Sequence, residues 1–413
     1  MGLNIWLIAS GEPLEYFGER PHRVGMLSRV LRDRGHDVAW WTTTFDHQHK
    51  KYFFNSTSNA KTQCGVNMVF LHSGTPYFKN ISYARIKNHL EVANEFRSIS
   101  NSCQVPNVIF CAYPTIDLAY EATKFAVKNN VPIVIDIRDL WPRIFLNPFP
   151  KIFHPIVSIF LFKYNNKAKY VFENCTSIIA VSEKYLNYGL YLGKRAKSKI
   201  DLVYPLAFHR NTLDGSLELS LRDKYKKFGL DVEKTIVWFV GTFGQTYDLT
   251  TVIKAAKKMQ NQNNVQFVFT GDGEMFKDWA LLAEGSLNTL FTGWVNAENL
   301  AYLSSVADIG LLAYKKNAPQ GLPNKIFEYL SAGIPILSSL EGESKFLLKE
   351  REVGLSYEAG NVDSFIQKLK EYIDDSELMN KTSRKCTALY EKSYSTQNVY
   401  GDLATYLEVV AKK

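Results

Sequence analysis

Residues 318–338, APQGLPNKIFEYLSAGIPILS, predict a loop, a short helix, an abrupt helix end and a buried strand. Pro323 suits the first position of a helix, where its missing N–H leaves no hydrogen bond unmade. Gly333 suits the left-handed position that ends a helix, and Pro335 prevents the helix from continuing. The stretch is therefore typical of a strand–helix–strand unit in an α/β protein.

Helical spacing places three polar side chains of this stretch on one face, because residues three and four apart are neighbours: Asn324, Lys325 and Glu328. The N–H groups at the start of the helix, with Lys325 beside them, form a site suited to a phosphate. Glu328 lies one turn further along, where a carboxylate could accept hydrogen bonds from a ribose. The pattern favours a bound nucleotide, and an ordinary helix with an exposed lysine and glutamate is the alternative.

The pattern L-P-x-K-x-x-E-Y-x-x-x-G-x-P at residues 322–335 resembles the E-x7-E region of the GT4 family of retaining glycosyltransferases, which have the GT-B fold. Within that family it is similar to WbuB-like bacterial O-antigen and capsular polysaccharide transferases. The second Glu of the motif binds the nucleotide ribose and is Glu328 here. The first faces the donor sugar, and Gln320 stands in its place. The resemblance implies catalytic roles for Lys325 and Gln320 and substrate contacts for Leu322, Pro323, Asn324 and Glu328.

The length of 413 residues predicts two domains, and 46% hydrophobic residues can form sizeable cores. Residues 1–200 hold 25 Lys and Arg against 14 Asp and Glu, whereas the remainder holds 24 against 27. A basic N-terminal half indicates an anionic partner, which could be nucleic acid, anionic lipid or a phosphorylated substrate. No dense Lys/Arg run with interleaved aromatic residues occurs, so nucleic acid is the least favoured.

Five scattered cysteines without a C-x-x-C motif indicate free thiols in a reducing compartment. The first residues lack the features of a signal peptide, and no apolar run reaches the length needed to span a bilayer. A cytoplasmic protein is therefore expected. If it binds a membrane, it is expected on the inner face of the cytoplasmic membrane.

Residues 152–172 alternate aromatic and aliphatic side chains with lysines. A basic amphipathic helix of this kind can lie among lipid headgroups. A core helix leading into the next strand is the alternative.

The N-terminus predicts a strand at 3–9, a helix at 23–34 and a second strand at 38–42. The loop between the first strand and the helix lies where doubly wound folds bind ligands. The resemblance places the corresponding family loop near donor and acceptor, with Gly11, Arg20 and Arg23 as the matching residues. Solvated loop arginines are the alternative.

The segment 132–142, PIVIDIRDLWP, runs from an apolar strand into three charged residues: Asp136, Arg138 and Asp139. Charges at the end of a buried strand are costly unless they pair or bind a ligand. The pattern D-x-R-D-L-W-P resembles WbuB-like enzymes, which implies a diphosphate or acceptor contact for Arg138. An ion pair of Arg138 with a carboxylate is the alternative. Many GT4 enzymes have a histidine beside the transferred sugar, and Tyr113 occupies that region here.

In the second half, the buried strand 236–240 leads into a turn that contains Gly241, Thr242 and Gly244. Such a turn places backbone N–H groups near phosphates. Many GT4 enzymes carry an Arg and a Lys hereabouts, but residues 242–248 contain neither, so Lys325 and Arg138 are expected to supply the charge. The resemblance also implies that Trp294 and Val295 contact the nucleobase.

These observations predict an α/β protein of the GT-B fold, with two doubly wound, Rossmann-like parallel-sheet domains facing across a cleft. Residues 1–205 are expected to form the acceptor side, residues 206–395 the nucleotide-sugar side, and residues 396–413 a helix returning to the first domain. The resemblance implies retaining transfer from a nucleotide sugar, expected to be UDP-linked, to a glycan or lipid-linked oligosaccharide acceptor. No D-x-D occurs, and His47 and His49 lack a third ligand, so no metal or other cofactor is expected.

Two other functions stay open. The same fold also serves nucleotide-sugar epimerases and phosphorylases. Gln320 at the position of the first Glu is compatible with a non-catalytic protein that binds nucleotide sugars.

Overall fold

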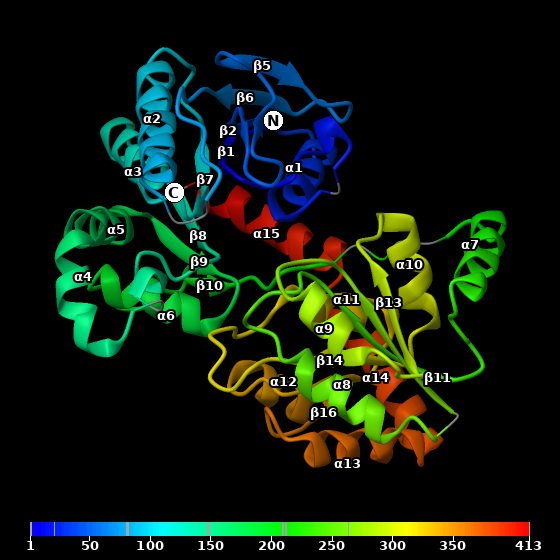
Figure 1. Cartoon of the computed structure of the whole chain (residues 1–413). Coiled ribbons are helices and arrows are strands. Elements are labelled where there is room, and N and C mark those ends of the chain that lie inside the picture. Colours follow the sequence, from blue (N-terminus) through cyan, green and yellow to red (C-terminus); the bar gives the residue numbers. More distant parts are fainter. Residues whose placement is uncertain are drawn as a thin grey trace. The chain divides into compact units, whose positions relative to one another are not determined.

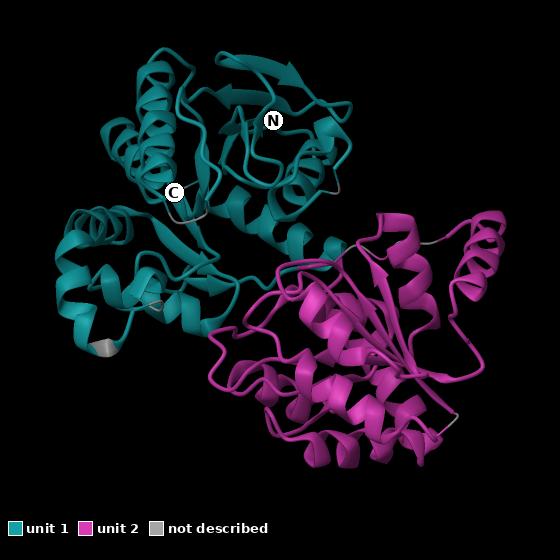
Figure 2. Ribbon diagram, in the orientation of Figure 1, with its two compact units in different colours: residues 1–206, 396–413 teal, residues 207–395 magenta. Residues whose placement is uncertain are grey.

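The computed structural model describes residues 2–19, 21–79, 82–146, 149–208, 210, 213–262 and 264–412. It divides the chain into two compact units, which Figure 2 shows in two colours. Unit 1 comprises residues 1–206 and 396–413, and unit 2 comprises residues 207–395. Each unit is a parallel sheet with helices packed on it, as expected for two Rossmann-like domains.

The described part of unit 1 contains an eight-stranded sheet in the order β10-β9-β8-β7-β1-β2-β6-β5. All neighbouring strands are parallel except β5 and β6. The strand order reverses between β1 and β7, and ligands of such sheets bind at the carboxyl ends of the strands there. The strands are β1 (Asn4–Ile8), β2 (Asp37–Thr43), β5 (Ser58–Lys61), β6 (Asn67–Leu71), β7 (Val108–Tyr113), β8 (Ile133–Ile137), β9 (Ser177–Ala180) and β10 (Leu202–Val203).

Helices cover both faces of this sheet, which is why β7 and β8 are buried along their whole length. A separate hairpin pairs β3 (Phe45–Asp46) with β4 (Lys51–Tyr52). The helices are α1 (Arg23–Asp33), α2 (Tyr83–Ser100), α3 (Ile116–Asn129), α4 (His154–Phe160), α5 (Phe162–Asn174), α6 (Glu183–Leu192) and α15 (Thr396–Val410).

The C-terminal helix α15, red in Figure 1, belongs to unit 1 and packs beside α1. Tyr406 Oη contacts Ser177 Oγ and donates to the carbonyl oxygen of Ile200 at 2.9 Å. Arg34 donates to the carbonyl oxygen of Gly401 at 2.8 Å. These polar contacts and a buried apolar face attach the end of the chain to the first sheet.

Unit 2 contains, among its described residues, a six-stranded parallel sheet in the order β13-β12-β11-β14-β15-β16. This is the strand order of a dinucleotide-binding Rossmann domain, and it reverses between β11 and β14. The strands are β11 (Thr235–Val240), β12 (Val265–Thr270), β13 (Thr289–Gly293), β14 (Ile309–Leu312), β15 (Ile336–Ser338) and β16 (Gly354–Ser356).

Two apolar cores fill the two faces of this second sheet. The helices that cover them are α7 (Gly215–Lys227), α8 (Leu249–Lys258), α9 (Phe276–Ala283), α10 (Ala297–Val306), α11 (Asn324–Ala332), α12 (Glu343–Arg351), α13 (Val362–Ile373) and α14 (Ser376–Ser393).

The expected single helix at 152–172 is wrong, because the structure divides this segment at Leu161 into α4 and α5. Helix α4 has no buried residue, whereas α5 buries Ala168, Val171 and Phe172 in the first core. Only the second half of the segment is therefore a core helix.

Candidate functional site

The reversal point of the second sheet brings together two residues that are far apart in the sequence, Gly241 and Lys325. Gly241 follows β11 directly and has a φ of +138°, which a residue with a side chain rarely adopts. A Cβ atom there would lie 2.5 Å from Lys325 Nζ and 2.6 Å from its Cε. The glycine is required because the lysine side chain crosses the end of β11.

Lys325 is the second residue of α11 and is only 9% exposed. Its Nζ donates to Tyr247 Oη at 2.7 Å and lies 4.3 Å from the centroid of the Tyr247 ring. In the part of the chain that the structure describes, no carboxylate lies within 4.0 Å of this ammonium group. A buried cation is stabilised by an anion, so the lysine can serve a negatively charged ligand.

The turns after β11 and β12 pack backbone against backbone through glycines. A Cβ on Gly271 would lie 1.9 Å from the carbonyl oxygen of Gly241, and one on Gly273 would lie 2.6 Å from that of Phe243. Phe243 N–H donates to the carbonyl oxygen of Asp272 at 2.8 Å. Since no side chains intervene, the backbones of the two turns lie directly against each other beside Lys325.

Helix α11 begins at Asn324, with Pro323 as its N-cap at φ −70° and ψ 152°. Proline has no side-chain acceptor, so it cannot cap the first N–H groups of the helix. The predicted position of Pro323 inside the helix is wrong by one residue, and Gly333 ends the helix in the left-handed region at φ +70°, as predicted. The amides at the start of α11 and the Lys325 ammonium therefore lie on the same turn.

Glu328 lies one turn further along α11 and lines a pocket of about 90 Å³ within unit 2. Arg210 and the hydroxyl-bearing Ser304 and Ser305 share the pocket wall. Nearby in the sequence, Gln320 Oε1 is buried and accepts no hydrogen bond from the described residues. The sequence interpretation missed Arg210, because it belongs to none of the recognised motifs.

The other residues predicted for this site lie on loops or at the helix start. Trp294 is 76% exposed and follows the end of β13, whereas Val295 packs against the second core of unit 2. Thr242 and Asn324 are exposed, and Gly244, Leu322 and Pro323 are half-buried. The structure gives Trp294 a free aromatic surface of the kind that a nucleobase could stack on.

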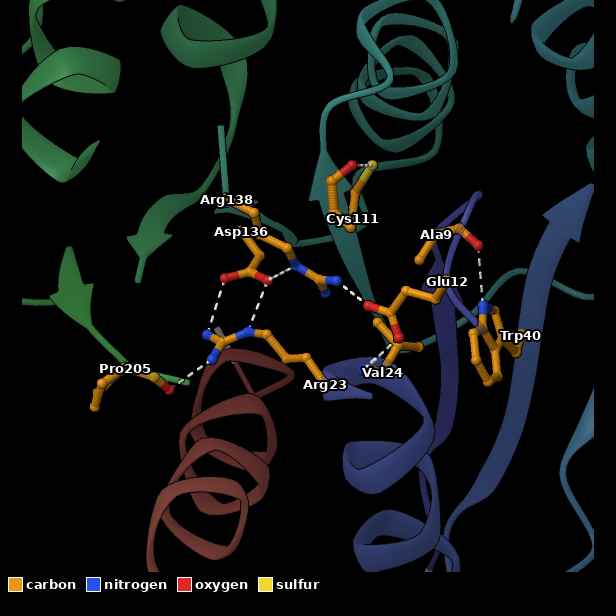
Figure 3. Close-up of polar contacts among 10 residues, drawn as sticks. Ala9, Glu12, Arg23, Val24, Trp40, Cys111, Asp136, Arg138 and Pro205 are labelled. Atoms are coloured by element: carbon orange, nitrogen blue, oxygen red, sulfur yellow. Dashed lines mark hydrogen bonds and ion pairs between the residues drawn. The ribbon is translucent and has the colours of Figure 1, made fainter. Parts of the chain in front are cut away.

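In unit 1, Figure 3 shows Arg23, Asp136 and Arg138 in one buried network. Arg23 is 2% exposed, and both its Nε and Nη2 lie 2.9 Å from oxygens of the fully buried Asp136. Its Nη1 donates to the carbonyl oxygen of Pro205 at 2.8 Å. Arg138 Nε donates to Asp136 at 2.7 Å, and its Nη1 contacts Glu12.

This network corrects the predicted ligand contacts of Arg23 and Asp136. Both side chains are buried, and the polar atoms of Asp136 are taken by guanidinium groups. Arg138 is held between two carboxylates, which is the ion pair that the sequence left as an alternative. The charges at the end of β8 stabilise the loop before α1 rather than forming an open site.

Tyr113 is also corrected, because its ring is fully buried and its hydroxyl donates to the carbonyl oxygen of Trp141 at 2.8 Å. Gly11 is exposed, with a φ of +79° in the turn after β1. Asp139 is half-buried, and burial raises the pKa of its carboxyl. Arg20 lies outside the described residues. Within the described residues, no group of three or more His, Cys, Asp or Glu side chains could hold a metal ion.

Replacing Gly241 with alanine should displace Lys325 and lower the free energy of unfolding by about 1–3 kcal/mol, through backbone strain and overpacking. Gly244→Ala is the matched control, because nothing lies within 4 Å of a Cβ at that position. Calorimetric melting of both variants checks this. Equal melting temperatures would contradict the close approach of Gly241 and Lys325.

This chain is similar to a known protein family and to two characterised relatives. Residues 222–387 match the family model described as Glycosyl transferases group 1. A UDP-Gal:alpha-D-GlcNAc-diphosphoundecaprenol alpha-1,3-galactosyltransferase of Escherichia coli is 27% identical over 40% of this chain and 42% of its own length, so the match spans less than half of that relative. An N-acetyl-alpha-D-glucosaminyl L-malate synthase of Bacillus anthracis is 23% identical over 93% of this chain and 92% of its own length.

Among solved structures, sucrose-phosphate synthase of Thermosynechococcus elongatus superposes with a TM-score of 0.71 at 13% identity, covering 100% of both chains. Because the sequence identity is only 13%, this likeness shows a shared fold but not a shared function. The matched family segment contains both Gly241 and the whole of α11. Residues 222–387 are therefore similar to the glycosyl transferases group 1 family, on a chain that has the GT-B fold.

Proposed function

We propose that the protein is a retaining glycosyltransferase that moves a sugar from a nucleotide sugar, with UDP as the nucleotide, to a glycan acceptor. The observation that carries this proposal is Lys325, a buried ammonium group at the first turn of α11, against the glycine that ends β11. The family match over residues 222–387 supports it. The UDP donor of the galactosyltransferase relative supports the choice of base.

Sugar transfer requires positive charge beside the diphosphate of the donor. When the bond between the anomeric carbon and the diphosphate breaks, negative charge grows on the departing nucleotide. Lys325 and the first amides of α11 would stabilise that charge, and both groups are already in place before the reaction begins. Glu328 would accept hydrogen bonds from the ribose, Trp294 and Val295 would contact the base, and Gln320 would face the sugar.

The acceptor we propose is a lipid-linked glycan in surface polysaccharide assembly. The enzyme would then be a WbuB-like transferase within GT4. The printed name of the galactosyltransferase relative gives it a diphosphoundecaprenol-linked acceptor, whereas the name of the Bacillus anthracis relative gives its product as N-acetyl-alpha-D-glucosaminyl L-malate. A diphosphate and a malate group are both anionic. The excess of basic residues in the first 200 residues of this chain is compatible with either.

The direct test is release of free nucleotide from a panel of UDP-sugars, with and without a lipid extract that supplies candidate acceptors. A transferase releases UDP faster when the acceptor is present. An epimerase would give an isomeric UDP-sugar without free UDP, a phosphorylase would require phosphate, and a binding protein would release nothing. Any of these three results would overturn the proposal.

We expect catalysis without a divalent metal, because the sequence contains no D-x-D motif and the Lys325 ammonium and the α11 amides would neutralise charge on the diphosphate instead. Turnover should therefore continue in EDTA at the untreated rate. Complete loss that Mg²⁺ or Mn²⁺ restores would contradict this leaving-group chemistry.

We also propose that unit 1 rests on anionic membranes through the segment 152–162. Its apolar side chains are exposed, among them Ile152 at 79%, Ile159 at 73% and Phe160 at 79%. An apolar patch of this kind marks an interaction surface, and Lys163 beside it is exposed. No described helix has the length and apolarity to cross a bilayer.

Flotation with vesicles that contain anionic lipid should recover the wild type and lose the double variant Ile159→Glu, Phe160→Ser. Burying such side chains contributes about 1.5–3 kcal/mol each, so partitioning should fall about tenfold or more. Phe346→Ser is the control, because Phe346 is 66% exposed on α12 of unit 2. Equal flotation of all three proteins would exclude this surface.

A further inference from the structure

A second pocket lies at the reversal point of the first sheet, between the ends of β1 and β7. It has a volume of about 120 Å³, and all its lining residues belong to unit 1. Ser10 and Gly11 follow β1, and Pro114 and Thr115 follow β7. This is the position at which doubly wound sheets bind ligands. Of the residues that line it, Gly11 was predicted from the sequence as a ligand contact, but the charged and aromatic side chains were not.

The charged group of this pocket is Arg85, in the first turn of α2. Its guanidinium lies 5.0 Å from the centroid of the Trp141 ring and 5.7 Å from that of Tyr77. Stacking of this kind holds a guanidinium in place. Arg85 also hydrogen-bonds to Tyr77 and interacts with the Asp139 carboxylate, which further fixes its position. Arg85 is therefore a positioned cation rather than a flexible surface side chain.

Two histidines line the same pocket, His47 and His89. His47 Nδ1 lies 2.7 Å from Tyr77 Oη and 3.4 Å from Lys50 Nζ. An ammonium group can only donate, so Nδ1 is the acceptor and a neutral His47 carries its proton on Nε2. His47 thus has an N–H group to offer in addition to the bonds it already makes.

Burial, and then the positive charge of Arg85, lower the pKa of His47 to about 4 and that of His89 to about 3. Both rings are neutral at physiological pH, and the positive charge of the pocket wall is that of Arg85. The nearby Asp46 is engaged, because it accepts from the N–H groups of Gln48 and His49 at 2.8 and 3.1 Å and contacts His49 Nδ1 at 2.7 Å.

The size of the pocket limits what it can take. Pockets for whole drug-sized ligands have volumes of about 300–1,000 Å³. A space of about 120 Å³ fits one phosphate or carboxylate group with a water molecule or two, but not a nucleotide sugar. The ligand must be a small group, or one end of a larger molecule.

We infer that this pocket binds an oxyanion group of the acceptor, a phosphate or a carboxylate, with Arg85 as its charge partner and His47 and His89 as neutral hydrogen-bonding groups. The inference rests on the proposed function, in which the acceptor binds to unit 1. The hydroxyls of Ser10 and Thr115 lie 3.5 Å apart at the pocket wall, and whichever accepts from the other can donate to the oxyanion.

Calorimetric titration of the full chain with inorganic phosphate and, separately, with acetate tests the inference and distinguishes the two oxyanions. UDP at saturation blocks the site at Lys325 during both titrations. The wild type should bind one of the two probes. Arg85→Met should bind it about tenfold more weakly or worse, because a charge-assisted contact is lost.

Lys87→Met is the matched control, because Lys87 lies on the same helix but is exposed. It should bind the probe like the wild type. Arg85→Gln provides a second neutral variant if Arg85→Met does not melt cooperatively. Absence of binding at millimolar probe, or equal binding by the wild type and a folded Arg85 variant, would overturn the inference.

If UDP itself does not bind, the proposed function fails, and the same titrations are made in a Lys325→Met background. Loss of probe binding on changing Arg85 would still establish the pocket. The two failures are therefore distinguishable.

Discussion

Lys325→Met should lower kcat by about 10²–10³-fold, the cost of removing one preorganised group that stabilises charge in the transition state. Methionine keeps an apolar stem of nearly the same length, so its Cε can still lie against Gly241, whereas the charge and the hydrogen bond to Tyr247 are lost. Because the charge on the departing diphosphate grows as the bond breaks, the effect should appear in kcat more than in KM. Steady-state kinetics with the preferred UDP-sugar measures both.

Lys345→Met is the control for that substitution, since Lys345 pairs with Glu341 on the exposed surface of α12. Its kinetics should match the wild type. If Lys325→Met, with a normal melting curve, retained the wild-type kcat, the lysine would not act on the leaving group.

Glu328→Gln should weaken UMP and UDP to the same extent, by about 10- to 150-fold, because a charge-assisted hydrogen bond contributes about 1.5–3 kcal/mol. The substitution keeps the shape of the side chain in its 90 Å³ pocket and removes the charge. Equal losses for both nucleotides are expected because Glu328 is assigned to the ribose, which they share. Lys325→Met should instead affect UDP more than UMP.

Glu350→Gln, at an exposed position of α12, controls for the change in net charge. Calorimetric titration gives the dissociation constants. Unchanged nucleotide affinity in a folded Glu328→Gln variant would remove the ribose assignment.

Local signals were sufficient to predict α11, because a proline near its start and a glycine and proline at its end set its limits within one residue. The alternation of strands and helices likewise predicted two parallel sheets. These elements depend on residues that are close together in the sequence, and such local patterns can be recognised in a single sequence.

Contacts between distant segments were harder to predict. The approach of Gly241 to Lys325 depends on β11 and β14 being neighbours, and nothing near either residue specifies that pairing. The charged residues at 136–139 indicated that burying them costs free energy unless they are paired. The sequence did not show that the partner of Asp136 is Arg23 from α1, so residues predicted to contact a ligand lie in a buried ion-pair network. Arg85 lies on a helix whose amphipathic pattern is weak, and no motif or spacing distinguishes it from the other arginines.

Amide hydrogen exchange of the full chain, with and without saturating UDP, tests most directly whether the nucleotide binds at the start of α11. Exchange reports on protection of individual backbone segments. We predict slower exchange in peptides that contain residues 241–244 and 324–328, with Glu328→Gln reducing both effects at the same UDP concentration. Unchanged exchange in these two segments at a UDP concentration that saturates the protein would contradict the proposed nucleotide site.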